Sequence, residues 1–339
     1  MNISISEKRI TSLFENFNNK TIAVIGDLML DRYFWGSVTR ISPEAPVPVV
    51  EVESEQGRLG GAANVAKNIK SLGGTPFLIG VVGNDNSGKQ LIDIVRESGF
   101  PADGILSDHS RPTTVKTRLI ANDQHIARVD RESRAEISFT IQNQIIETLL
   151  RNINSIDGII IEDYNKGVIV KTLIKQIIDV AKEHGKIITI DPKFHNFFEY
   201  KNVTVFKPNK KEVEEALGKQ LKTEQDVLEA GKQLLEKLKA ENVLLTRGPQ
   251  GMSLFESNGE ITHIPTKALS VSDVSGAGDT VIATMTLSLA AGASVSESAV
   301  LANHAGGIVV GYVGIAPIQK EELFNSVIAD SEVTSSKGN

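Results

Sequence analysis

Short apolar runs alternate with longer amphipathic segments along most of this chain. The longer segments, among them Ala62–Leu72 and Ile169–His184, place apolar residues three or four apart, as helices do. The short runs are apolar at most positions, as in strands buried on both faces of a sheet: Thr21–Gly26, Pro76–Val82, Gly158–Glu162, Lys186–Ile190 and Val243–Thr246. Strands joined by helices of this length predict an α/β fold with a mostly parallel central sheet flanked by helices.

Two regions do not follow this alternation of strands and helices. Tyr33–Glu53 is rich in Val and Pro and has no helical period, and Thr113–Asp130 alternates polar and apolar residues. Both patterns predict antiparallel strands outside the main sheet, which would form a small β lid. No repeat or Pro- and Ser-rich linker divides the chain, which favours a single domain over residues 1–330 with the lid inserted. The polar residues 331–339 are expected to be disordered.

Composition limits the classes of protein that fit. The 339 residues are 40% apolar, which is enough for a sizeable core. The net charge of −6 and the lack of a run of Lys and Arg argue against a nucleic-acid partner. The absence of cysteine excludes disulfides and thiolate metal sites. The N-terminus lacks a signal-peptide core and residues 281–295 are too few to span a bilayer, so we expect a cytoplasmic protein without a membrane partner.

The strongest functional pattern is the segment Asp273–Thr280, DVSGAGDT, which precedes a long run of small residues. Gly276 and Gly278 allow a tight turn that leaves no Cβ near a ligand. The helix that follows would direct free N–H groups and its positive end at the same point. Asp279 would then place a carboxylate beside an anion-binding site. An acid that only caps the helix is the alternative, and it accounts less well for this combination of features.

A second glycine pair, Gly60 and Gly61, opens the predicted helix that contains Asn64. Alone, it is equally compatible with a plain tight turn, and the chain has no GxxxxGK[ST] phosphate loop. Together, residues 60–74 (GGAANVAKNIKSLGG) and 273–292 (DVSGAGDTVIATMTLSLAAG) resemble the two signatures of the ribokinase-like carbohydrate kinases. The resemblance covers nearly the whole chain.

Within that superfamily, residues 33–50 (YFWGSVTRISPEAPVPVV) resemble the D-glycero-D-manno-heptose 7-phosphate kinases of lipopolysaccharide precursor synthesis, and the segments IEDYNKG and IDPK agree with them. The resemblance implies a ribokinase-like fold. It also implies that the γ-phosphate of ATP, with Mg²⁺, is transferred to the anomeric hydroxyl of D-glycero-β-D-manno-heptose 7-phosphate. The product would be the 1,7-bisphosphate, a precursor of ADP-heptose. The sequence leaves open which anomer is used and whether K⁺ is needed.

The resemblance assigns roles to individual residues. Asp279 would be the catalytic base, and the backbone of Gly276, Ala277 and Gly278 would bind the transferred phosphate. Phosphoryl transfer requires both functions on physical grounds as well. The sugar would be held by residues near the end of the first strand and in the second glycine segment: Asp31, Gly60, Gly61 and Asn64, with Asp27 a weaker candidate.

The nucleotide would be held by residues from the second half of the chain. Asn209 and Glu212 match a motif linked to phosphate and Mg²⁺, with Glu212 as a ligand of the metal either directly or through water. The same pair would also suit a helix cap, and both interpretations can hold at once. The resemblance implies further contacts from Thr246, Arg247 and Gly248 beside the phosphates and from Asn303 near the adenine.

Basic residues are candidates for binding phosphate. Lys166 and Lys193, with Asp163, directly follow predicted strands, where α/β sheets bind ligands, although most surface lysines are merely solvated. A sugar that already carries a phosphate needs a second anion site, for which guanidinium groups are suited. The candidates lie near the lid, where charges that protect a sheet edge are an equal alternative: Arg40, Lys116, Arg118 and Arg128.

Departures from the family pattern bear on the substrate and on partners. Ala62 and Ala63 argue against free ribose, and Glu162 stands where heptose kinases tend to have a small residue. No HxGH motif of a nucleotidyltransferase occurs, so that activity is expected on a separate protein. The resemblance also implies a homodimer paired through the lid strands. Two alternatives remain: a kinase for another sugar or sugar phosphate such as a fructose phosphate, and a non-catalytic regulator that binds a nucleotide or sugar.

Overall fold

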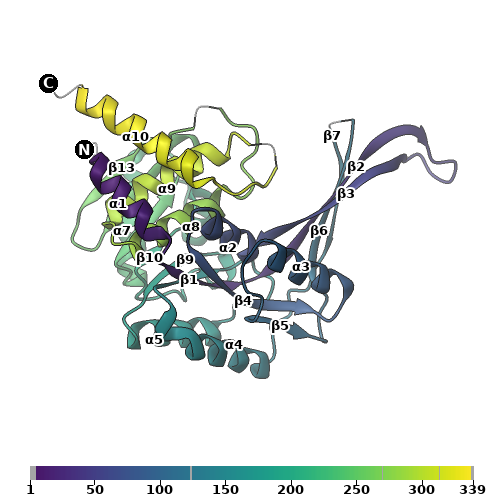
Figure 1. The fold of residues 1–339 in the computed structure, drawn as a ribbon, viewed down its shortest axis with the longest axis horizontal. Helices are drawn as coiled ribbons and strands as arrows, with labels where there is room; N and C mark the ends of the chain where they lie inside the picture. The colour runs from purple at the N-terminus through teal and green to yellow at the C-terminus, as the bar shows by residue number, and fades with distance from the viewer. Residues whose placement is uncertain (1–4, 123, 269, 313, 337–339) are drawn as a thin grey trace.

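The computed structural model describes residues 5–336 except 123, 269 and 313. Its centre is a nine-stranded sheet (Figure 1). The strands from β11 to β5 run parallel, whereas β12 pairs antiparallel with β11, and the edge strand β13 pairs antiparallel with β12. The strands are, in spatial order, β13 (Ile261–Ile264), β12 (Met252–Glu256), β11 (Asn242–Thr246), β10 (Val205–Phe206), β9 (Ile187–Asp191), β8 (Gly158–Glu162), β1 (Thr21–Gly26), β4 (Thr75–Gly83) and β5 (Ile105–Asp108). The five runs expected to be buried strands all lie in this sheet, as predicted.

Helices cover both faces of the sheet and close two separate apolar cores. One face carries α1 (Glu7–Phe17), α2 (Ala62–Ser71), α3 (Asn86–Glu97), α8 (Ala277–Ala290), α9 (Val295–Val309) and α10 (Lys320–Ser336). The other face carries α4 (Phe139–Asn152), α5 (Lys171–Glu183), α6 (Lys210–Leu217) and α7 (Glu224–Leu238). Helices α8 and α9 are apolar on nearly all sides because they are enclosed between the sheet and the outer helices α1 and α10.

The second sheet forms an arm that projects from the body, as Figure 1 shows. It consists of β2 (Leu28–Ile41), β3 (Pro48–Gly61), β6 (Thr114–Ala121) and β7 (Gln124–Arg131), in the order β3-β2-β6-β7. The predicted antiparallel pairing holds within the two hairpins, β2–β3 and β6–β7, but β2 and β6 pair in parallel. The lid follows the central strand β1 almost directly, so its base lies at the carboxyl end of the main sheet.

The C-terminal segment differs from its prediction. Residues 331–336, which were expected to be disordered, form the end of α10, and residues 337–339 lie outside the described part. A helix that has already formed gains one hydrogen bond for each residue added, so a polar sequence can extend it. Among the described residues, no helix is both long and apolar enough to cross a membrane.

Candidate active site

The segment that carried the strongest motif forms the beginning of α8. Gly276 has a φ of 78°, a left-handed conformation that favours glycine, and it precedes the first helical residue. The N–H of Ala277 donates to the carbonyl of Val274 at 3.3 Å. The N–H groups of Gly278 and Asp279 lie in the first turn, where a helix supplies no acceptor. The turn therefore presents donors and a positive helix end at one point, as an anion site requires.

Asp279 is buried at this helix start and is held by two side chains from distant elements. Its Oδ2 accepts a hydrogen bond from Asn64 Nδ2 at 2.7 Å, and its Oδ1 accepts one from the Tyr164 hydroxyl at 2.7 Å. Burial raises the pKa of Asp279 to about 6, although both hydrogen bonds act to lower it. The site thus holds a carboxylate in a fixed orientation and makes it a better proton acceptor than an exposed aspartate.

The predicted sugar-binding residues meet at the base of the lid. Asp31 on β2 is buried, accepts a hydrogen bond from Arg118 of β6 and lies opposite Arg58 in the register of the β2–β3 hairpin. A Cβ on Gly60 would lie 2.1 Å from Asp31 Oδ2, so only glycine leaves room for this carboxylate. Gly61 has a φ of 58° and leads into α2, whose third residue is Asn64. The structure therefore brings both glycine segments to Asp279.

Most of the predicted nucleotide-binding residues line one cavity of about 690 Å³ beside the start of α8. They are Lys193, Asn209, Thr246, Arg247, Gly248 and Asn303, together with Gly276, Ala277, Gly278 and Asp279. Glu212 does not line the cavity itself, but it contacts Lys193 and Asn209, which do. Asn209 and Glu212 form a complete capping box on α6, in which each side chain accepts from the backbone N–H of the other at 2.9 Å. Glu212 Oε1 also accepts from Lys193 Nζ at 2.5 Å.

Two charged residues that were not assigned individually from the sequence join the site. Asp191 ends β9 and Lys207 follows β10, and they form an ion pair at 2.7 Å with both side chains buried. A Cβ on Gly278 would lie 3.4 Å from Asp191 Oδ2 and 3.5 Å from Lys207 Nζ, so the pair directly underlies the α8 turn. Asp191 belongs to the IDPK segment, but its partner could not be named from the sequence because Lys207 follows β10, a strand of only two residues that the apolar pattern did not predict.

Tyr164 also gained its role only from the structure. Its hydroxyl bonds Asp279, and its ring lies 5.3 Å from Lys116 Nζ and 5.4 Å from Lys193 Nζ. Tyr164 lies in the loop after β8, which is fixed by Asp27: the Asp27 carboxylate accepts from the N–H groups of Tyr164 at 2.8 Å and Lys166 at 3.1 Å. Asp27, the weaker sugar-binding candidate, thus holds the loop that positions Tyr164.

The basic candidates differ in whether they already form an ion pair with an acidic residue. Arg40 and Arg128 are exposed on the arm and pair with Glu51 and Asp130, and Lys166 pairs with Glu132 at 2.7 Å. Arg118 pairs with Asp31 at the base of the lid. Lys116 is half-buried there and forms no ion pair within the described part of the chain. Burial lowers the pKa of Lys116, as expected for an ammonium without a close counter-charge.

Asp163 faces the protein interior. It is fully buried, and its Oδ2 accepts from the Tyr200 hydroxyl at 2.6 Å and from Asn196 Nδ2 at 3.1 Å. Its Oδ1 accepts from the N–H of Asn165 at 2.8 Å. These contacts favour a role in holding the loop after β8 rather than direct contact with a sugar.

Comparisons with known proteins agree with this geometry. A family model described as pfkB family carbohydrate kinase matches residues 19–321. The chain is 41% identical over 323 residues to the bifunctional protein HldE of Geobacter sulfurreducens, in a match that covers 95% of this chain and 66% of that protein. This chain therefore spans about two thirds of the length of the curated relatives it matches, 66% and 63% for two of them.

Solved structures share the fold at low sequence identity. Ribokinase of Arabidopsis thaliana, complexed with ribose and ATP, has a TM-score of 0.71 at 18% identity, covering 91% of this chain and 98% of that chain. The tetrameric inhibited form of phosphofructokinase-2 from Escherichia coli has a TM-score of 0.75 at 20% identity, covering 92% and 99%. These likenesses confirm the ribokinase-like α/β fold expected from the sequence.

Two tyrosines that each donate to a buried aspartate allow a matched test of the role of Tyr164. Tyr164→Phe removes one of the two donors to Asp279, and we expect kcat with MgATP and a sugar acceptor to fall roughly tenfold, because a hydrogen bond to a charged group contributes about 1.5–3 kcal/mol. Tyr200→Phe removes the equivalent bond to Asp163, so it should lower the melting temperature while largely preserving kcat. Steady-state kinetics and thermal unfolding of both variants provide the measurement. Equal effects on kcat would contradict a specific role of Tyr164.

Proposed function

The chain belongs to the pfkB family of carbohydrate kinases, and we propose that its substrate is a heptose 7-phosphate, phosphorylated by ATP on the anomeric hydroxyl. The observation that carries the proposal is the buried Asp279 carboxylate, oriented by two donors at the N-terminus of α8 and open to the cavity. A base and an anion site at one point are what transfer of a phosphoryl group to a hydroxyl requires. The assignment of the sugar rests on the resemblance of residues 33–50 to heptose 7-phosphate kinases.

In this proposal, Asp279 accepts the proton of the attacking hydroxyl. Its pKa, raised by burial, favours this step, and Asn64 and Tyr164 keep its oxygens in place. The N–H groups of Gly278 and Asp279 would donate to the transferred phosphoryl group. Lys207, buried beside Gly278, adds positive charge that needs no reorganisation during the reaction.

The residues near the cavity also fit the Mg²⁺ that accompanies ATP in such kinases. Asp191 and Asn209 line the cavity, and the Glu212 carboxylate accepts a hydrogen bond from the N–H of Asn209. Carboxylate and amide oxygens are the hard ligands that Mg²⁺ prefers. The metal would neutralise charge on the nucleotide phosphates. Glu212 itself orients Lys193 and caps α6, so its contact with a metal would run through water.

The phosphate already present on the sugar needs a cation at the opposite end of the substrate from Asp279. Lys116 suits this role because it is half-buried at the base of the lid and has no ion-pair partner among the described residues. Arg118, beside it on the same strand, is held by Asp31. A ligand phosphate could therefore bind Lys116 without breaking an existing salt bridge, which is not true of Arg40, Arg128 or Lys166.

The first test compares acceptors and the proposed base. We expect ADP release from MgATP with D-glycero-D-manno-heptose 7-phosphate but little with ribose, fructose or fructose 6-phosphate. Asp279→Asn should lower kcat roughly a thousandfold, within the range for loss of a general base, and retain ATP binding. Asp93→Asn, on the exposed surface of α3, is the matched control. Turnover on another sugar would overturn the proposed substrate, and binding of ATP without any turnover would favour a regulator.

A second variant tests the proposed site for the sugar phosphate. Lys116→Ala should raise KM for the sugar phosphate about tenfold, because it removes a charge-assisted contact, and leave KM for ATP unchanged. Arg40→Ala, on the outer part of the lid, should have little effect on either KM. Steady-state kinetics with both substrates varied would measure this, and similar KM values for the two variants would rule out Lys116 as the anchor.

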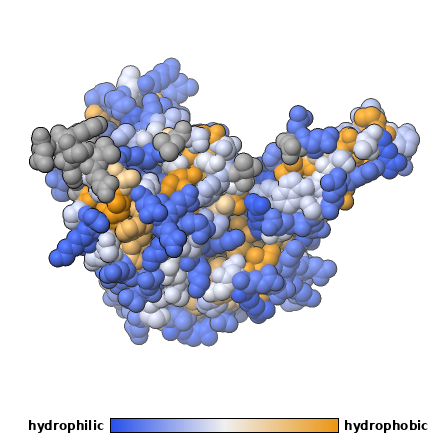
Figure 2. Space-filling model, turned by 45° about the horizontal axis from the view of Figure 1, so that its top comes forward, coloured by the Kyte–Doolittle hydropathy of each residue, from blue (hydrophilic) through white to orange (hydrophobic). Residues whose placement is uncertain are grey.

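We further propose that two copies associate through the lid. The arm carries exposed apolar side chains, including Ile41, Val52 and Val129, and apolar surface is visible on it in Figure 2. Its outer strands β3 and β7 leave sheet edges open to pairing. Val52→Glu should shift the mass measured by light scattering from a dimer to a monomer, whereas Glu53→Gln on the same strand should not. A monomeric wild-type protein would overturn this proposal.

A further inference from the structure

Glu162, the last residue of β8, is a buried carboxylate for which the described residues provide no hydrogen bond or ion pair. It is 0% exposed, and among the described residues neither Oε1 nor Oε2 has a hydrogen-bond partner. A carboxylate in this situation is costly, because a buried charge requires a partner, a proton or a metal ion. The mechanism proposed above does not use this residue.

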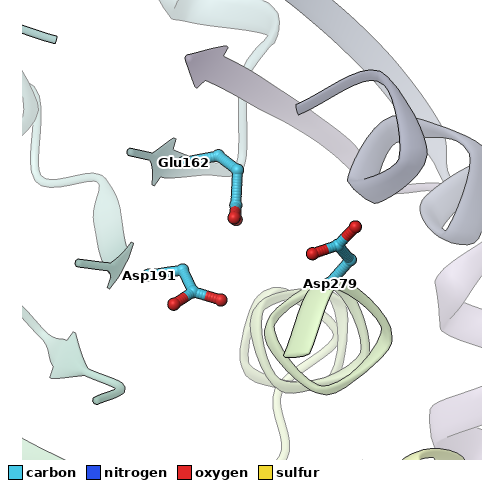
Figure 3. Close-up of side chains that lie close together, drawn as sticks. All are labelled: Glu162, Asp191 and Asp279. Atoms are coloured by element: carbon cyan, nitrogen blue, oxygen red, sulfur yellow. The ribbon is translucent and has the colours of Figure 1, made fainter. Parts of the chain in front are cut away.

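The Glu162 carboxylate points toward two others, as Figure 3 shows. Asp191 comes from β9 and Asp279 from α8, and one oxygen of each of the three residues lies within 4.8 Å of the other two. All three side chains are buried. The three carboxylates therefore converge on one point from three separate elements, although like charges repel strongly when they are removed from water.

Nearby positive charge does not balance this cluster. Lys207 pairs with Asp191 at 2.7 Å, and Lys193 is engaged by Glu212 at 2.5 Å. Asn64 and Tyr164 donate to Asp279 but carry no charge. When all three carboxylates are ionised, the single charge of Lys207 leaves an excess of two negative charges. A divalent cation supplies that amount of charge and also gives Glu162 a partner.

We infer that Glu162, Asp191 and Asp279 together bind a divalent cation before the nucleotide arrives. Three carboxylate oxygens leave half of an octahedral shell for water and for phosphate oxygens, which suits Mg²⁺ or Mn²⁺. Asp191 and Asp279 border the cavity, so an ion entering through it can reach the cluster. The inference relies on the proposed function only for the location of the phosphoryl group, and it makes Glu162 a metal ligand in addition to the residues around Glu212.

The Glu162 carboxylate differs from that of Glu212 in what its oxygens already bind. Glu212 Oε1 accepts from Lys193 and Oε2 from the N–H of Asn209. Both oxygens of Glu162 are free of such contacts in the described structure. A cation that binds in the absence of nucleotide should therefore prefer the Glu162 cluster, whereas a cation delivered with ATP can be held near Glu212 through water.

The test is a titration of Mn²⁺ into the nucleotide-free and sugar-free protein, with unbound Mn²⁺ measured by electron paramagnetic resonance. We expect one bound ion per chain that Mg²⁺ displaces. Glu162→Gln, which keeps the size of the side chain, should weaken its binding at least about tenfold, since a direct carboxylate ligand is lost. Glu97→Gln, at the exposed end of α3, is the matched control and should bind Mn²⁺ as the wild type does. Circular dichroism would verify that both variants are folded.

The outcomes separate this inference from the proposed function. If the wild-type protein binds no Mn²⁺ without nucleotide, the inference fails, and Glu162 is neutralised by a proton instead. Equal affinities of the wild type and Glu162→Gln would also overturn it. Should Glu162→Gln not fold, two measurements still test the inference: the wild-type protein should bind one Mn²⁺ per chain, and Asp191→Asn should weaken that binding. None of these results depends on which sugar is phosphorylated, because the titration contains neither a sugar acceptor nor ATP.

Discussion

The active site depends on keeping the Asp279 carboxylate out of water without losing its ability to carry charge. Moving a carboxylate into a protein interior costs several kcal/mol even after relaxation. Here the cost is offset by the positive end of α8 and by hydrogen bonds from Asn64 and Tyr164. Because these groups come from α2, the loop after β8 and α8, the main sheet and the lid base must be assembled before the site exists.

The parallel sheet explains why so many polar residues meet at this point. Strands β1, β8, β9 and β10 are neighbours, and all of them end at the same edge. The residues at or after those ends are Asp27, Glu162, Asp191 and Lys207, each of them buried. Apolar side chains fill most positions within these four strands, so their buried charged groups lie where a strand ends and a loop or helix start can supply a partner.

The sequence predicted the fold because continuous apolar runs and amphipathic segments carry local information about strands and helices. Asp279, Asn64 and the glycines could be named as candidates because their motifs are contiguous. The ion pair of Asp191 with Lys207 could not be predicted, since Lys207 follows the two-residue strand β10, which has no clear apolar pattern. The bond from Tyr164 to Asp279 could not be predicted either, since it joins residues 115 positions apart. The sequence could also not show which basic residue near the lid lacks an ion pair, because the acidic partners are known only from the structure.

Tyr164 connects the two substrate regions of the site. Its ring lies 5.3 Å from Lys116 Nζ, an ammonium of the lid, and 5.4 Å from Lys193 Nζ, an ammonium of the body, while its hydroxyl donates to Asp279. Cations near an aromatic ring are attracted by its electrons, so the position of Tyr164 depends on both lysines. In the function proposed above, a phosphate that draws Lys116 toward itself would change the forces on Tyr164 and hence on the carboxylate of Asp279. Phosphate binding at the lid and orientation of the proposed base would then be physically coupled through one side chain.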